Sequence, residues 1–161
     1  MMIAHQHIHK DSFAFCLSTA AAYHFDLAGL IVQHVQAQNI SYHDYDAIKI
    51  VLQEVIANAV IHGNLDIQAM ERRTLDGLNK MQALLEARLS DPSYAQRWLK
   101  IHFTLKGDTL LFSVQDQGQW RNTDGMTQGR GFFLIQHHTA SYAIDKETST
   151  TSVCFKNHLL A

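Results

Sequence analysis

The sequence predicts one domain of the α+β class over residues 1–161. Its length and its apolar content of 47% are sufficient for a single buried core. Short runs that alternate between apolar and polar residues indicate strands, and longer stretches carry apolar residues at helical spacing. Because no Gly/Ser-rich linker or internal repeat separates these segments, we expect them to share that core.

The composition argues against nucleic acid and membranes as partners. The formal net charge is -2, and the sequence has no basic patch of the kind that binds nucleic acid. No apolar run reaches the roughly 20 residues that span a bilayer, and residues 1–11 lack the pattern of a signal peptide. We therefore expect a cytoplasmic protein that binds a small molecule or another protein. Cys16 and Cys154 lie in strand-like runs, which indicates reduced core thiols.

The N-terminal residues contain three histidines at alternate positions, His5, His7 and His9, which would share one side of an extended segment. These histidines could bind a metal ion, but no further ligand stands at a known spacing. The preferred interpretation is therefore that they are solvated. Residues 12–17 are predicted to form the first strand, and residues 26–37 a helix.

A second helix, from about residue 42 to 62, organises the rest of the chain. Ser41 and Asp44 are spaced as a capping pair at its start. Gly63 and Asn64 follow its end, where they would supply the left-handed residues that terminate helices.

This helix has one apolar face and a polar stripe beside it. Glu54, Asn58 and His62 are four residues apart, so their side chains stack along that stripe. By itself the stripe is explained equally well by polar residues that only satisfy their own hydrogen bonds.

The region 65–100 favours helix, in one or two segments that Asp91-Pro92 interrupts. We expect its apolar stripe to pack on its own domain, the alternatives being a cover over the site or a surface for a partner. The stripe consists of Met70, Leu75, Leu78, Met81, Leu84, Leu85 and Leu89.

A hairpin follows, with strands at residues 99–105 and 110–114 and a turn at 106–108. Its second strand leads directly into Asp116-Gln-Gly118. An acid at a strand end, followed by a glycine that permits close approach, can bind the polar edge of a flat ligand. The same residues are also compatible with an ordinary turn.

Residues 122–131 are rich in loop formers and precede a short helix at 132–138. Gly129 and Gly131 would expose backbone N–H groups at the start of that helix, where phosphate binds well, and Arg130 adds positive charge. The alternative is a glycine-rich loop that only caps a helix. Two closing strands are predicted at residues 141–144 and 151–156, joined by a polar turn at 145–150.

The common nucleotide-binding motifs are absent from the sequence. It contains no Gly-x-x-x-x-Gly-Lys-Ser/Thr loop, no Gly-x-Gly-x-x-Gly turn after a first strand, and neither His-Arg-Asp nor Asp-Phe-Gly of protein kinases. A less common nucleotide-binding fold is what remains.

The order of the motifs resembles that of the GHKL, or histidine-kinase-like, ATPase domain. The likeness is closest to the small serine kinases that act as anti-sigma factors, and it extends from about Ser12 to Phe155. It implies a two-layer α/β sandwich of the Bergerat type, with a mixed, mostly antiparallel sheet, helices on one face and a helical insertion at about 65–100. ATP would lie between the helix at 42–62, called the N-box helix in this family, and a lid.

The resemblance assigns roles to individual residues. Asn58 matches the asparagine whose side-chain oxygen holds Mg2+ against the ATP phosphates, which suits a hard cation. Glu54 matches the acid that takes a proton from the attacking hydroxyl or water. Asp116 matches the acceptor for the adenine amino group, and Gly118 the glycine that allows adenine to approach.

Four further residues complete the predicted site. Gly129, Arg130 and Gly131 match the second glycine box, whose backbone amides embrace the phosphates. Thr151 matches a threonine of the last strand that helps to bind adenine.

By this resemblance we expect an ATP- and Mg2+-dependent serine/threonine protein kinase that phosphorylates a small anti-anti-sigma-type protein and thereby controls a sigma factor. Homodimers are common among such relatives. Two departures from the family pattern, Trp120 in place of a second glycine and the long insertion, motivate the alternative of a nucleotide-sensing module that sequesters a partner without phosphate transfer. A degenerate scaffold that binds no nucleotide is the third possibility.

Overall fold

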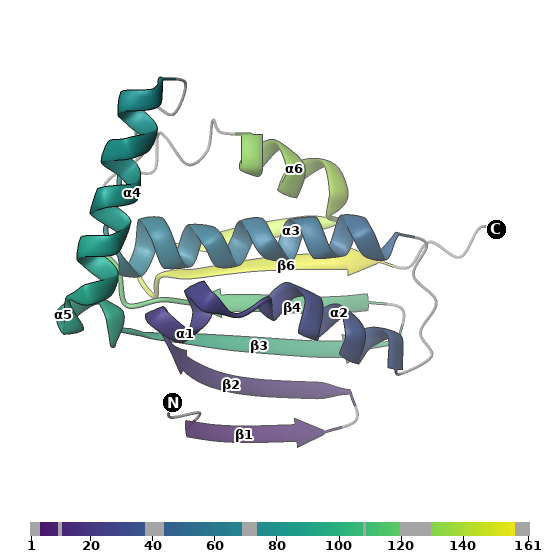
Figure 1. Cartoon of the computed structure of the whole chain (residues 1–161). Coiled ribbons are helices and arrows are strands. Elements are labelled where there is room, and N and C mark those ends of the chain that lie inside the picture. The colour runs from purple at the N-terminus through teal and green to yellow at the C-terminus, as the bar shows by residue number, and fades with distance from the viewer. Residues whose placement is uncertain are drawn as a thin grey trace.

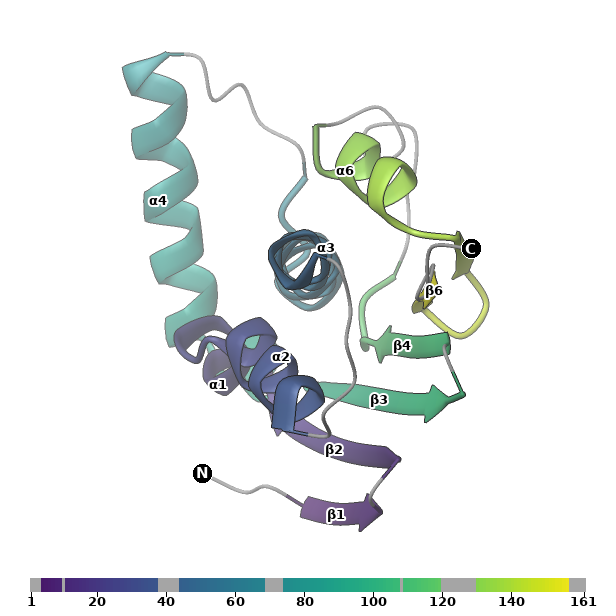
Figure 2. The same cartoon turned by 90° about the vertical axis from the view of Figure 1, so that its right-hand side faces the viewer.

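Six strands form one antiparallel sheet in the order β1-β2-β3-β4-β6-β5, and helices cover one of its faces (Figures 1 and 2). The computed structural model describes residues 4–9, 11–37, 44–68, 74–107, 109–119 and 130–156. The strands are β1 (Ala4–His9), β2 (Ser12–Ser18), β3 (Trp98–Lys106), β4 (Thr109–Gln115), β5 (Ser141–Asp145) and β6 (Thr150–Lys156). The predicted two-layer α/β sandwich is thus confirmed, and every strand pair in the described residues is antiparallel.

The helical layer runs along the sheet, and the insertion stands at one end of it (Figure 1). The helices are α1 (Thr19–His24), α2 (Leu27–Ala37), α3 (Tyr45–Asn58), the π-helix η1 (Ala59–Asn64), α4 (Leu75–Ser90), α5 (Pro92–Ala95) and α6 (Arg130–His138). Both views show α4 steeply inclined to α3, beside the end of α3 that continues into η1.

The core lies between the sheet and α2, α3 and η1. Strand residues alternate between buried and accessible positions, so that Phe103 of β3 and Phe112 of β4 face the helices and pair across the two strands. Val51, Leu52 and Val55 of α3 are buried against them. The helical spacing of the α3 apolar residues therefore fixes which of its faces remains available for polar side chains.

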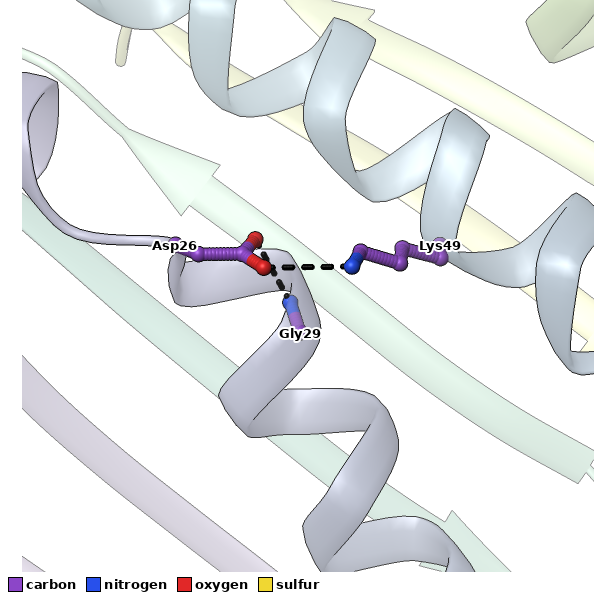
Figure 3. Close-up of polar contacts among 3 residues, drawn as sticks. All are labelled: Asp26, Gly29 and Lys49. Atoms are coloured by element: carbon purple, nitrogen blue, oxygen red, sulfur yellow. Dashed lines mark hydrogen bonds and ion pairs between the residues drawn. The ribbon is translucent and has the colours of Figure 1, made fainter.

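Asp26 joins α2 to α3 through two interactions (Figure 3). Its carboxylate accepts a hydrogen bond of 3.0 Å from the Gly29 N–H in the first turn of α2, and it forms an ion pair of 3.1 Å with Lys49 Nζ on α3. The Gly29 N–H and the Lys49 ammonium both favour the charged carboxylate, so the pKa of Asp26 is lowered.

Most predicted elements are confirmed, but β1 and α1 were not predicted, so the strand expected to be the first, at residues 12–17, is the second strand of the chain. The strand at 12–17, the helix at 26–37, the hairpin and the two closing strands are present within a residue or two of their predicted bounds. The region 65–100 contains α4 and α5, separated at Asp91, which accepts a hydrogen bond from Ser93 N–H as an N-cap.

The helix predicted at 42–62 is α3 followed by η1, and its predicted end was wrong. Asp44 caps the start by accepting a hydrogen bond of 2.8 Å from Ala47 N–H, whereas Ser41 lies outside the described residues. Gly63 and Asn64 stay within η1, and the left-handed conformation belongs to Asp66, with a φ of 51°. The glycine is therefore needed for packing, not for backbone conformation.

The apolar stripe of the insertion is only partly buried. Met81 is buried and Leu84, Leu85 and Leu89 pack against the core, but Leu75 and Leu78 are 75% and 50% exposed. The prediction that the whole stripe packs on its own domain was therefore wrong for Leu75 and Leu78. Met70 lies outside the described residues.

Both cysteines are free, as expected, but they are half-buried and do not belong to the core. Among the described residues, no helix is long and apolar enough to cross a membrane.

Candidate functional site

Glu54, in the polar stripe of α3, lies against the first turn of α6. Glu54 and Asn58 are half-buried and lie on successive turns, because four residues advance slightly more than one helical turn. Helices α3 and α6 pack against each other, and Glu54 is the residue of the stripe that lies at their interface, beside Gly131.

Glu54 and Gly131 are in direct contact at this interface. A Cβ atom built on Gly131 would overlap the Glu54 carboxylate, at Oε2 first. A larger residue at position 131 would require the Glu54 carboxylate to move away from the start of α6. Because backbone N–H groups at a helix start carry partial positive charge, the contact places an acidic side chain where anions are stabilised.

Asp116 follows β4, is buried and lies against Gly63 of η1. Its Oδ1 accepts a hydrogen bond of 2.7 Å from Gly118 N–H. A Cβ atom on Gly63 would lie 2.5 Å from Asp116 Cγ, and one on Gly118 would overlap the Gly63 backbone. Gly63 and Gly118 thus leave space for each other and for the carboxylate, which brings the Asp-x-Gly turn into contact with the end of the α3–η1 helix.

Thr151 lies beside this turn on the helix-covered face of the sheet. It is buried on β6 and pairs with Val114 of β4, two residues before Asp116. The predicted adenine-binding pair, Asp116 and Thr151, therefore sits at one place in the fold.

His62 completes the α3 stripe but acts within the fold. Its Nδ1 is 2.6 Å from the Ile67 carbonyl oxygen, across the end of η1.

Several predicted residues lie wholly or partly outside the described residues. Gly129 and Trp120 lie outside the described residues, and Arg130 is described only as the first residue of α6. The backbone of His5, His7 and His9 lies in β1. Among the described residues, no group of three His, Cys, Asp or Glu side chains could hold a metal ion.

Two residues that were not predicted as site residues, Asn64 and Ser149, bond to the Asp116–Gly118 segment. Asn64 was interpreted as a helix terminator, and Ser149 as part of a polar turn. No local pattern signals either role, because each bonds to residues more than 30 positions away.

The described residues fit ATP in their chemistry. Asn58 supplies a neutral oxygen for a hard cation, and Asp116 supplies a buried acceptor beside two glycines.

The comparisons with known proteins agree with this geometry. The model of the histidine kinase-like ATPase domain matches residues 18–156. No curated protein showed a significant match.

Proposed function

Because the chain belongs to the histidine kinase-like ATPase domain family, we propose that it is an ATP- and Mg2+-dependent serine/threonine protein kinase of the anti-sigma-factor type. Members of this family are ATP-binding domains that generally depend on Mg2+. The protein that accepts the phosphate and the regulatory role are proposed in addition. The observation that carries it is the contact between Glu54 and Gly131, which unites a candidate base with a candidate phosphate-binding helix start.

The nucleotide would lie between α3 and α6. Asp116 would accept a hydrogen bond from the adenine amino group, and Gly118 and Thr151 would be the other adenine-binding residues. The backbone amides at the start of α6 bind the phosphates, with Gly129, Arg130 and Gly131 as the second glycine box. Mg2+ would be held by Asn58 and would neutralise charge on the phosphates.

Glu54 serves as the general base in this proposal. As the acceptor hydroxyl attacks the γ-phosphorus, a new O–P bond forms, the bond to the β-phosphate oxygen breaks, and ADP leaves. The hydroxyl proton passes to the Glu54 carboxylate, which α3 directs at the start of α6.

The proposed acceptor is a serine or threonine of a small anti-anti-sigma-type protein. Phosphorylation would release this antagonist and leave the kinase to bind a sigma factor, as a monomer or as a homodimer. The support is the resemblance to the anti-sigma branch, in which such partners alternate.

A Glu54→Gln variant tests the kinase proposal. This change keeps the size of the side chain and removes its basicity, so phosphate transfer should fall by about 100-fold or more while ATP still binds. Labelled ATP and candidate antagonists encoded beside the gene provide the assay, and Glu86→Gln, on the exposed face of α4, is the matched control. Transfer at the wild-type rate in Glu54→Gln would contradict the assigned base.

The second candidate function is a nucleotide-sensing module that sequesters a partner without phosphorylating it. The exposed Leu75 and Leu78 on α4 favour a protein-binding role for the insertion, and Trp120 departs from the kinase pattern. In that case Glu54→Gln would regulate its partner normally, and the wild-type protein would yield no phosphoserine or phosphothreonine while ATP binds.

A further inference from the structure

The segment Asp116–Gly118 is held from two sides by residues outside the family motifs. Gln117 N–H donates a hydrogen bond of 2.7 Å to Asn64 Oδ1. On the other side, Asp116 N–H donates to the Ser149 carbonyl oxygen at 3.1 Å, and Ser149 Oγ donates to the Gly118 carbonyl oxygen at 2.9 Å. Each of the three residues of the segment is therefore bound through its backbone.

Asn64 is fixed in one orientation. Its side chain is fully buried, and Nδ2 donates to Thr19 Oγ1 at 2.8 Å and to the Trp98 carbonyl oxygen at 3.0 Å. Since both amide hydrogens have acceptors there, Oδ1 must point at Gln117. A buried amide with every partner in place is rigid, and it transmits that rigidity to the segment it binds.

The Thr19 hydroxyl and Arg97 anchor this arrangement. Thr19 Oγ1 donates to the Arg97 carbonyl oxygen at 2.8 Å, and Arg97 Nη1 donates to the Asn64 carbonyl oxygen at 2.8 Å. The start of α1 and the end of the insertion therefore fix the position of Asn64.

Ser149 adopts a backbone conformation that serine seldom takes. Its φ is 52°, in the left-handed region, and the residue is only 9% exposed. A non-glycine residue persists there when surrounding contacts determine it, and such residues cluster at functional sites. The hydroxyl bond to Gly118 and the carbonyl bond to Asp116 are those contacts.

We infer that Asn64 and Ser149 are positioning residues that aim the Asp116 carboxylate and so set the preference of the site for adenine over guanine. The inference rests on the proposed function, in which Asp116 accepts the adenine amino group. Guanine carries a carbonyl oxygen at that position, which the carboxylate repels. Recognition of the amino group requires the carboxylate to be held in place, because a hydrogen bond weakens steeply when its geometry is lost.

The experiment compares Asn64→Ala and Ser149→Gly with the wild-type protein. Ser149→Gly removes the hydroxyl and retains a residue suited to positive φ, so it should fold even where Asn64→Ala does not. Thr74→Ala removes the N-cap of α4, which does not touch the segment, and is the control for lost stability alone. The measurements are the Kd values of Mg-ATP and Mg-GTP, competition by Mg2+-tripolyphosphate, and hydrogen exchange at Gln117 and Gly118.

We expect ATP affinity to fall by about tenfold in Asn64→Ala and by a smaller factor in Ser149→Gly, while GTP and tripolyphosphate bind as before. A lower folded fraction would reduce binding of all three ligands equally, so the ATP-to-GTP ratio separates positioning from stability. Thr74→Ala should keep the wild-type ratio. An unchanged ratio in folded Asn64→Ala or Ser149→Gly would overturn the inference.

Hydrogen exchange keeps this test distinct from that of the proposed function. If the wild-type protein bound no ATP, the proposed function would fail, and exchange would still decide whether the segment is held. Faster exchange at Gln117 in Asn64→Ala, relative to Thr74→Ala, supports the positioning role. Wild-type protection at Gln117 would overturn it.

Discussion

Adding one methyl group at Gly63 is a sharp test of the packing between η1 and the Asp116 turn. The new Cβ would lie 2.5 Å from Asp116 Cγ and 2.6 and 2.7 Å from its two carboxylate oxygens. Carbon atoms in contact are ordinarily about 3.5–4.0 Å apart, so the carboxylate would have to move by roughly 1 Å.

The carboxylate has little freedom to make that movement. Its Oδ1 is bound to Gly118 N–H at 2.7 Å, and Gly118 in turn lies against the Gly63 backbone. Overpacking of this kind costs about 1–3 kcal/mol of unfolding free energy. A displaced Asp116 would also lose the hydrogen bond proposed between it and adenine, which corresponds to about tenfold or more in ATP affinity.

Urea unfolding and calorimetric titration with Mg-ATP measure both effects in Gly63→Ala. Gly107→Ala is the matched control, because Gly107 has a φ of 63° and nothing within 4 Å of an added Cβ. It should lose about 1–2 kcal/mol from backbone strain and keep its ATP affinity. Wild-type stability and ATP affinity in Gly63→Ala would refute the close packing proposed between Gly63 and Asp116.

Three other substitutions probe the scaffold. Asp26→Asn removes the ion pair with Lys49. The Gly29 N–H and the Lys49 ammonium lower the pKa of Asp26 in the folded state, so the stability that its charge contributes is present above its ordinary pKa and is lost as pH falls through the lowered pKa. The difference in unfolding free energy between wild type and variant should therefore be larger at about pH 6 than in acid, and a difference that does not change with pH would contradict the assignment. Asp44→Ala should lower the unfolding free energy by about 1 kcal/mol through loss of the α3 N-cap, and Asp44→Asn, which can still cap, should restore most of it; equal losses in both would count against the cap. Phe112→Ala should cost about 3–5 kcal/mol in urea unfolding because the ring is fully buried, and a loss below 1 kcal/mol would mean that it is not in the core.

Features with a local pattern could be predicted from the sequence. The alternation in β3 and β4 and the helical spacing in α3 are imposed by burial of one face, so they are visible in the chain itself. The placement of Glu54 and Asn58 on successive turns follows from the same periodicity.

Features that depend on long-range contacts could not be predicted from the sequence. Gly63 follows a helical pattern, and a helix-ending role was the local expectation, but the approach of Asp116 from 53 positions away is what excludes a side chain there. Asn64 is likewise a common turn residue, and only the folded structure brings it to Gln117. Leu75 and Leu78 match helical spacing yet stay exposed, because spacing shows which residues share a face and not whether anything covers it.

The insertion has a physical connection to the Asp116 segment through Arg97 and Asn64. The guanidinium stacks on the Tyr94 ring at 4.6 Å from its centroid, and Nη1 bonds to the Asn64 carbonyl oxygen at 2.8 Å. Arg88 of α4 lies over the same ring at 3.9 Å. Arg88 of α4 and Tyr94 of α5 therefore pack with Arg97, whose guanidinium bonds to Asn64, and Asn64 holds the Asp116 segment.

Titration of the wild-type protein and of Asp116→Asn with ATP, with and without Mg2+, tests the central claim most directly. The wild-type protein should bind ATP saturably, more tightly with Mg2+, and in preference to GTP. Asp116→Asn should lose about tenfold or more in ATP affinity, because a charged acceptor for the adenine amino group becomes neutral. Absence of ATP binding in the wild-type protein, or an unchanged affinity and ATP-to-GTP preference in Asp116→Asn, would contradict the account.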